Sequence, residues 1–171
     1  MPLLNWIKTK SNEGDEETLR AAVECCLALC QATSDDPRTR ARASQNMSRL
    51  LEEKDALLTL LTLLSLSHGF YTRFGALQLL VLLVEHRRLE VQDYVLTAPG
   101  GSSSVLQCLE AAPSSSTEII RNEALLLLPQ LVRDNADIQK IVAFEGAFER
   151  LLDIIVPVSY THLTLPTSDL V

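Results

Sequence analysis

The cysteines and histidines are the residues of this sequence whose side chains most readily do chemistry. A thiolate can act as a nucleophile or a metal ligand, and an imidazole can carry a proton or bind a metal. The cysteines are Cys25, Cys26, Cys30 and Cys108, and none forms the CxxC pair typical of a zinc site. Cys26 and Cys30 lie four residues apart, on one face of an apolar helix. We therefore interpret them as small core residues rather than as a redox or metal site.

The histidines are His68, His86 and His162, and none has a histidine or cysteine four residues further on. His86 precedes two arginines near a predicted helix C-terminus, where a cation interacts favourably with the helix dipole. We predict capping or solvent-exposed roles for these side chains. The sequence also lacks GxSxG, Walker-type and GxGxxG motifs. It therefore predicts no catalytic, cofactor-binding or metal-binding residues, no cofactor, and a protein that is not an enzyme.

Two further polar features have plain interpretations. The loop at residues 99–102, Pro-Gly-Gly-Ser, resembles a phosphate-binding loop only superficially, because no buried strand precedes it and no lysine follows. It is better interpreted as a turn between helices. A solvated helix face is predicted for Arg38, Arg40 and Arg42. The more specific alternative is that these arginines attract an acidic partner or anionic lipid.

Composition limits both the fold and the partners. The chain has 171 residues, about one domain, and a net charge of −7. An acidic chain is a poor partner for nucleic acid, and an aromatic content of 5 % disfavours a many-stranded β fold. The N-terminus lacks the features of a signal peptide, and the longest nearly uncharged run, residues 56–70, is too short to span a membrane. We expect a cytoplasmic protein, associated with membranes at most peripherally.

Apolar residues recur at spacings of three and four along most of the chain, which is the pattern of amphipathic helices. The predicted helix N-caps are Asp36 before Pro37, then Asp55, and either Asn135 or Asp137 for the helix that ends at residue 144. His68 and Gly69 are predicted to end a helix, and Pro129 to kink one. The predicted helices cover residues 16–31, 37–51, 56–66, 71–87, 90–96, 103–111, 117–133, 135–144 and 147–155.

The helices repeat along the chain. Residues 73–84 match residues 121–132 at an offset of 48, Gln92 matches Gln139 at 47, and Gly100 matches Gly146 at 46. Such a period is typical of armadillo and HEAT repeats. We predict an all-α, armadillo/HEAT-like right-handed helical solenoid of about three repeats, covering residues 16–66, 71–111 and 117–155. The residues predicted to be buried on its two central long helices are Leu77, Leu80, Val84, Leu125, Leu128 and Val132.

Residues 118–128 (EIIRNEALLLL) and 138–151 (IQKIVAFEGAFERL) resemble the armadillo-like head of the general vesicular transport factor family. Residues 71–83 and 91–99 resemble the preceding repeat of that head. The resemblance covers residues 57–155 well and 16–51 loosely. These proteins are coiled-coil tethers that act between endoplasmic reticulum and Golgi, so the resemblance implies Rab-family GTPases, SNAREs and golgins as partners. It also implies a homodimer in the full-length protein and a peripheral location on Golgi and vesicle membranes.

The sequence departs from this family after Ile155. Members resembling it continue with an acidic, Gly-rich loop and another repeat, whereas residues 156–171 are almost uncharged and lack a helical period. They resemble a translated sequencing-adaptor tail, and a genuine disordered C-terminus is the alternative. We therefore expect residues 1–155 to be part of a longer head. The coiled coil and acidic tail of the family are expected to be missing, as is the neighbour that would cover the last repeat.

Two classes of function are compatible with this sequence. The first is a non-enzymatic vesicle-tethering head that docks vesicles before SNARE-mediated fusion. The alternative is a generic armadillo-repeat adaptor for extended peptide cargo, as in nuclear import. That adaptor would carry regularly spaced Trp and Asn residues, and Trp6, outside the repeats, is the single tryptophan. An all-helical enzyme ranks third, and the partner-binding residues cannot be assigned from the sequence.

Overall fold

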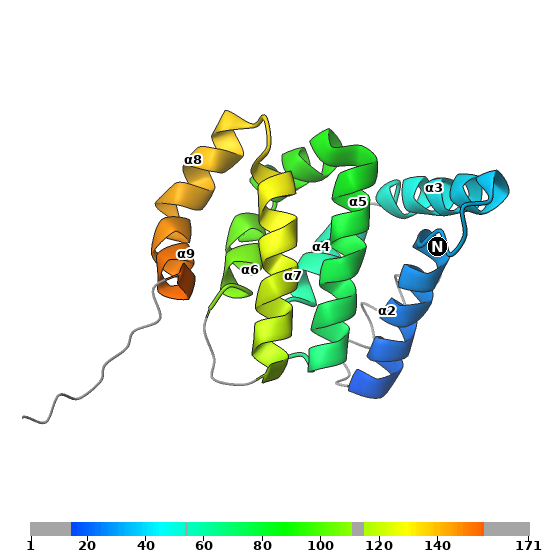
Figure 1. Ribbon diagram of the computed structural model, residues 1–171, viewed down its shortest axis with the longest axis horizontal. Coiled ribbons are helices and arrows are strands. Elements are labelled where there is room, and N and C mark those ends of the chain that lie inside the picture. The colour runs from blue at the N-terminus through cyan, green and yellow to red at the C-terminus, as the bar shows by residue number, and fades with distance from the viewer. Residues whose placement is uncertain (1–14, 54, 111–114, 156–171) are drawn as a thin grey trace, which may run out of the picture.

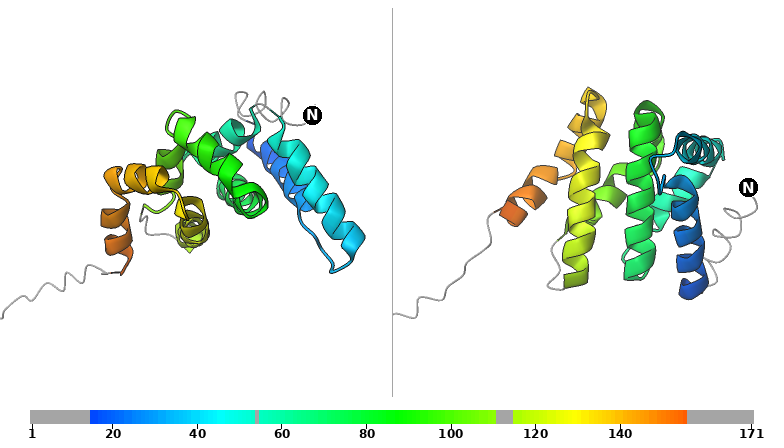
Figure 2. Two further views of the ribbon diagram at one scale, coloured as in Figure 1. Left: turned by 90° about the horizontal axis from the view of Figure 1, so that it is seen from above. Right: turned by 45° about the vertical axis from the view of Figure 1, so that its right-hand side comes forward.

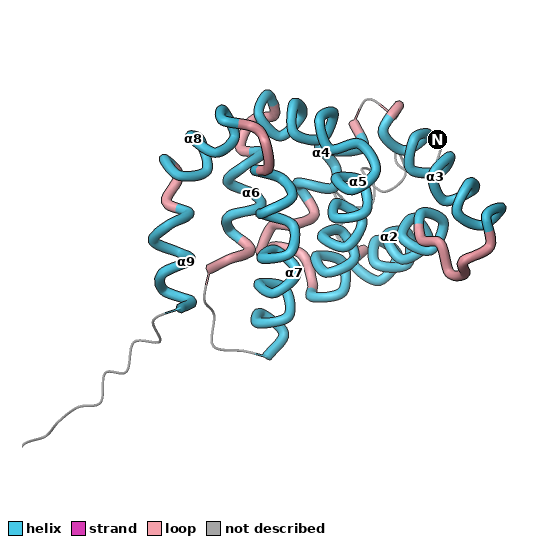
Figure 3. Tube along the Cα trace, turned by 45° about the horizontal axis from the view of Figure 1, so that its top comes forward, coloured by secondary structure: helices cyan, strands magenta, loops and turns pink. Residues whose placement is uncertain are grey.

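The computed structural model describes residues 15–53, 55–110 and 115–155, and these residues carry helices and no strand (Figure 3). The predicted tail at residues 156–171, with His162, and the N-terminal segment with Trp6 lie outside the described residues. The helices are α2 (Glu16–Cys30), α3 (Pro37–Leu51), α4 (Ala56–Thr62), α5 (Phe70–Thr97), α6 (Gly101–Gln107), α7 (Ser115–Val132), α8 (Ala136–Phe144) and α9 (Ala147–Ile155).

The long helices stand side by side in one layer. α5 packs between α2 and α7, and Figure 1 shows the three nearly parallel. The shorter helices α4 and α6 lie behind them and contact each other, and α8 and α9 follow at the far end. Seen from above, the helices follow an arc (Figure 2). The all-α, armadillo-like solenoid predicted from the sequence is confirmed. The two helices at the start of the stack, α2 and α3, have 15 residues each.

Asp36 and Asn135 cap their helices as predicted, whereas Asp55 occupies the N-cap position of α4 without a side-chain capping hydrogen bond. The side chain of Asp36 accepts a hydrogen bond from the Thr39 N–H at 3.1 Å, and Pro37 occupies the first turn of α3. Asn135 accepts from the N–H of Ile138 at 3.1 Å at the start of α8. Such side chains satisfy N–H groups that have no partner within the helix.

Two predicted helix ends are wrong. The helix predicted at residues 103–111 is α6, which ends at Gln107, and the helix predicted at residues 56–66 also ends early. α4 ends at Thr62, and Gly69, predicted to close that helix, is instead the N-cap of α5. The hydroxyl of Thr62 donates to the carbonyl of Leu58 at 2.6 Å, and the following N–H groups bond to carbonyls three residues back. These local bonds tighten the last turn and replace the continuing α-helical ladder. Leu63 and Leu64 remain fully buried beyond the helix end.

The two helices predicted at residues 71–87 and 90–96 are joined in α5 without a loop. Within α5 only Arg87 has non-helical angles, φ −141° and ψ 68°. The chain bends at this residue, and the second helical half begins directly after it. The boundary between long and short helix is thus where the sequence placed it, and a sharp elbow replaces the expected linker. This elbow forms the upper edge of the molecule in Figure 1.

The Pro-Gly-Gly-Ser segment is the turn between α5 and α6, as predicted. Gly100 has φ +68°, a left-handed conformation that glycine adopts without a steric penalty. A side chain on Gly101 would collide with the backbone carbonyl of Val95. Gly100 therefore permits the turn, and Gly101 permits the close approach of α5 and α6.

One apolar core runs through all the helices from α2 to α9. Four of the six residues predicted to be buried on the long helices are at most 6 % exposed, namely Leu77, Leu80, Val84 and Leu128. The prediction is wrong for Leu125 and Val132, which pack against the core but stay half-buried. Long helices cover both flanks of α5, whereas among the described residues only one flank of α7 packs against another long helix.

A carboxylate from α2 caps the start of α5. Gly69 has no side chain to cap its own helix, and Glu16 accepts a hydrogen bond from its N–H at 2.8 Å. The other oxygen of this carboxylate lies 3.4 Å from Nδ1 of His68. Burial on its own raises the pKa of Glu16, but the hydrogen-bond donors around it and the nearby imidazole hold the pKa below its ordinary value of 4.5.

Replacing Glu16 by Gln should lower the free energy of unfolding by about 1 kcal/mol at neutral pH, since a charged cap is lost. The folded-state pKa is lowered, so this stabilisation is present above the ordinary value of 4.5 and is lost as the pH falls through the folded-state value. Thermal melts of both proteins at neutral and acidic pH measure the difference. Equal destabilisation at both pH values would show that the carboxylate charge is not involved.

Candidate functional site

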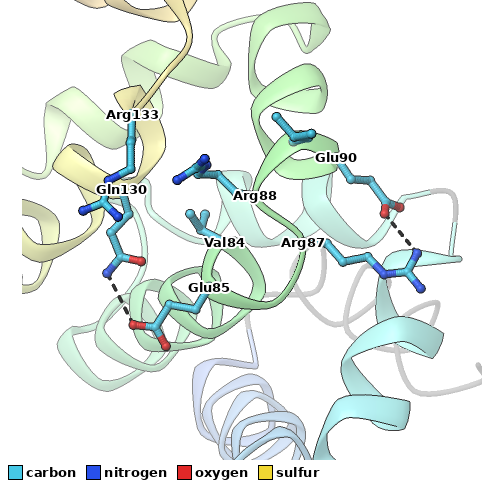
Figure 4. Close-up of a pocket in the computed structure, with 8 residues that line it drawn as sticks. Val84, Glu85, Arg87, Arg88, Glu90, Gln130 and Arg133 are labelled. Carbon is cyan, nitrogen blue, oxygen red and sulfur yellow. Dashed lines mark hydrogen bonds and ion pairs between the residues drawn. The ribbon is translucent and has the colours of Figure 1, made fainter.

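A hollow of the described surface lies at the elbow of α5. This elbow groove has a volume of about 790 Å³. Figure 4 shows side chains from the bend of α5 and from the end of α7 pointing around it. We define the groove by its lining residues: Val84, Glu85, Arg87, Arg88, Leu89, Glu90, Gln130 and Arg133.

The bend of α5 positions one side of the groove. Because Arg87 leaves helical geometry, the next residues turn toward α7 instead of continuing along the first half of the helix. On the other side, α7 ends at Val132, which places Arg133 at the rim. Val84 contributes an almost fully buried apolar wall, whereas Leu89 is 72 % exposed. The groove therefore combines a deep apolar surface with charged side chains at its edge.

Gln92 holds the two sides together. Its side chain is fully buried, and its Nε2 donates to the carbonyl oxygens of Leu131 and Arg133, at 2.8 Å each. These carbonyls belong to the end of α7, where backbone acceptors lack partners within the helix. The amide therefore fastens the end of α7 to the second half of α5. The sequence repeat drew attention to Gln92 but gave no sign of this contact.

Two hydrogen-bonded pairs lie within the groove, and both involve a glutamate. The amide of Gln130 donates to Glu85 at 3.4 Å, and Arg87 pairs with Glu90 at 3.2 Å. Figure 4 shows these two pairs on opposite sides of the groove.

The other two arginines have unused donors. Arg88 pairs through Nη2 with the exposed Asp134 at 3.0 Å, and its Nε is buried without a hydrogen-bond partner in the described structure. Arg133 is exposed, and no hydrogen bond or ion pair of its side chain occurs within the described residues. Arg88 and Arg133 thus both have guanidinium donors without a partner among the described residues.

His68 and His86 do not take the predicted capping or solvent-exposed roles, because both are partly buried and contact other helices. Nε2 of His86 is 2.9 Å from the hydroxyl of Ser48, which also accepts a hydrogen bond from Arg87 at 3.3 Å. These contacts attach α3 to the elbow. His68 lies beside Glu16 at the start of α5. Among the described residues, no three His, Cys, Asp or Glu side chains gather in a way that would hold a metal ion.

The arginines of α3 form an exposed surface, as predicted. Arg38, Arg40 and Arg42 are all solvent-exposed, and Arg40 donates to the backbone carbonyl of Asp35 at 2.9 Å. α3 lies at the opposite end of the molecule from α9 (Figure 1). This surface does not line the elbow groove.

Three of the four cysteines are buried and one is exposed. Burial raises the pKa of Cys26 to about 11, and neighbouring thiols add to the shift. Burial likewise raises the pKa of Cys30 and of Cys108. The interpretation of Cys26 and Cys30 as core residues is confirmed by their burial, whereas Cys25 faces solvent.

A thiol reagent should distinguish these cysteines. In the native protein at neutral pH we expect rapid alkylation of Cys25 alone, because only the exposed thiol is accessible and thiolates are the reactive form. In denaturant the thiols of the other three cysteines should become accessible and be alkylated as well. Mass spectrometry after a short treatment with iodoacetamide measures the number of modified residues, and fast native labelling of Cys26 or Cys30 would contradict the packing of α2.

The largest exposed apolar side chains gather toward the α9 end. Phe144 is 94 % exposed and Phe148 65 %, and Leu152 and Ile155 on α9 are also exposed. In Figure 1, α8 and α9 form this end of the helical arc. No helix of the described residues is long and apolar enough to cross a membrane.

No family model matches the chain. Several related proteins do match it. Golgin candidate 6 of Arabidopsis thaliana is 36 % identical over 148 residues, which is 85 % of this chain and 16 % of that protein. General vesicular transport factor p115 of Homo sapiens is 41 % identical over 112 residues, 66 % of this chain and 11 % of p115. Intracellular protein transport protein USO1 of Saccharomyces cerevisiae is 30 % identical and covers 90 % of this chain and 10 % of USO1.

The fold has a solved counterpart. A crystal structure of Uso1-2 matches with a TM-score of 0.75 and 26 % sequence identity, covering 90 % of this chain and 26 % of that one. The chain thus spans between 10 % and 16 % of the length of these related proteins. By sequence and by fold, it is a member of the p115/Uso1 family of general vesicular transport factors, homologous to one segment of those proteins.

Proposed function

We propose that this chain is part of a vesicle-tethering head that acts in transport from endoplasmic reticulum to Golgi and within the Golgi. The observation that carries the proposal is the 41 % identity with general vesicular transport factor p115, together with 30 % identity to USO1 over 90 % of the chain. The alternative of a generic adaptor for extended peptide cargo has no comparable support.

The mechanism that we propose is binding of proteins without catalysis. Stacked helices present a long surface to partners, and the segments at residues 16–66, 71–111 and 117–155 serve as the repeating units. Rab-family GTPases, SNAREs and golgins are the proposed partners, and the full-length protein is proposed to be a homodimer. The protein would then work in the cytoplasm, held peripherally on Golgi and vesicle membranes.

Affinity capture tests this function. The purified chain is immobilised and incubated with a detergent extract of cells, and the retained proteins are identified by mass spectrometry against a bead-only control. Enrichment of Rab GTPases and SNAREs supports tethering. Enrichment of nuclear-import cargo instead would overturn the proposal in favour of the adaptor.

A further inference from the structure

The elbow groove leaves positive charge available on the surface of an acidic chain. Its lining contains three arginines and two glutamates, whereas the whole chain carries a net charge of −7. Both glutamates are already engaged, one by Gln130 and one by Arg87. The exposed Arg133 and the partly exposed end of Arg88 are therefore the cations that an incoming ligand would meet.

Arg88 and Arg133 come from different helices and face the same hollow. Figure 4 shows both side chains on the α7 side of the groove, with Val84 nearby. Arg88 has an unpartnered buried Nε, and its side chain is 33 % exposed. A guanidinium in such a position gains most from a planar acceptor with two oxygens, which is the geometry of a carboxylate.

From this arrangement we infer that the elbow groove binds an acidic segment of a partner protein. A Glu or Asp side chain of the segment enters between Arg88 and Arg133 and accepts hydrogen bonds from both. An apolar neighbour in the segment packs on the exposed Leu89 at the rim. This inference rests on the proposed function, because it specifies how one surface of the head would recognise a partner.

The shape of the groove favours a protein segment over a lipid surface. Arg88 is recessed, and a slender side chain can enter the groove, whereas a flat bilayer presents its phosphates in one plane. Five of the exposed large apolar side chains, which could insert into a bilayer, lie on α8 and α9, whereas only Leu89 lies among the lining residues of the groove. Anionic lipid is therefore an alternative for the experiment to exclude.

The test is a titration followed by nuclear magnetic resonance. The full chain, labelled with ¹⁵N, is titrated with a synthetic peptide that has Glu-Leu-Glu at its centre and otherwise Ser and Gly. We expect saturable shifts confined to the amides around Arg88, Leu89, Gln130 and Arg133. Arg133→Gln should raise the dissociation constant about tenfold, since one charge-assisted contact is lost. Arg88→Gln should act in the same direction.

The controls separate binding from folding. Arg133 has no side-chain partner within the described structure, so Arg133→Gln should leave the melting temperature unchanged even if Arg88→Gln lowers it by losing Asp134. Lys140→Gln removes an exposed cation of α8, which is paired with Asp137 outside the groove, and should change the dissociation constant less than twofold. A peptide with Gln-Leu-Gln should not bind.

Three results would overturn the inference. They are the absence of saturable shifts at the groove, equal binding of the Gln-Leu-Gln peptide, and binding to phosphatidylserine vesicles that depends on Arg133 while the acidic peptide does not bind. These outcomes concern the groove alone. If both the native chain and Arg133→Gln capture Rab GTPases and SNAREs, the tethering function is supported. The elbow groove is then not required for that function.

Discussion

Replacing Leu77 by Ala is expected to lower the free energy of unfolding by about 3 kcal/mol. Leu77 lies on α5, is fully buried, and belongs to the helix that packs between α2 and α7. Truncation removes apolar contacts on both sides and leaves a cavity that the long helices cannot close without moving. Alanine is a good helix former, so the loss measures packing and not helix propensity.

Urea denaturation followed by circular dichroism measures this loss, and α7 offers a matched control. Leu126 lies on a comparable long helix but is 60 % exposed, so Leu126→Ala should change the free energy of unfolding by less than about 0.5 kcal/mol. Equal effects of the two substitutions would show that α5 is not the central helix of the stack.

Replacing Gln92 by Leu is expected to destabilise the protein by about 2 kcal/mol, although leucine is similar in size and more apolar. Two carbonyls at the end of α7 lose the donor that the Gln92 amide supplies, and an unpaired buried acceptor costs more than the average hydrogen bond contributes. The end of α7 should also loosen. Hydrogen exchange should therefore speed up in the last turn of α7 more than in α2.

Gln139 is the control for this substitution, because it occupies the matching place of the next repeat in the sequence. It is exposed, and its Nε2 donates to the Val132 carbonyl at 2.9 Å. Gln139→Leu should cost less than about 1 kcal/mol, since water can replace the lost donor. If Gln139→Leu cost as much as Gln92→Leu, the buried contact between the two helices would not be the source of the effect.

The helices were largely predictable because their signals are local. Asp36, Pro37 and Asn135 act within one turn of their own helix, and apolar spacing identifies the buried face of α5. The errors arise where contacts with other parts of the chain, and not the local sequence, determine the structure. Leu63 and Leu64 are fully buried by their neighbours beyond the end of α4, and Leu125 stays half-buried because one flank of α7 lacks a long helix among the described residues.

The candidate groove was not predictable from the sequence. Arg87 and Arg88 were interpreted only as cations near a helix end, and Arg133 only as the last residue of a predicted helix. Their meeting depends on the elbow at Arg87 and on the stacking of α5 against α7, which bring residues about 45 positions apart to one hollow. A helical repeat predicts such stacking in general, but not which side chains face each other.

The central claim is that this chain supplies part of a vesicle-tethering head, and transport in yeast tests it most directly. The segment of Saccharomyces cerevisiae USO1 that matches the chain is replaced by residues 15–155, and movement of a secretory cargo from endoplasmic reticulum to Golgi is followed by pulse-chase. We predict that the chimera supports transport, whereas a USO1 lacking the segment does not. A chimera present at native levels and with a native melting profile that fails to move cargo would contradict the claim.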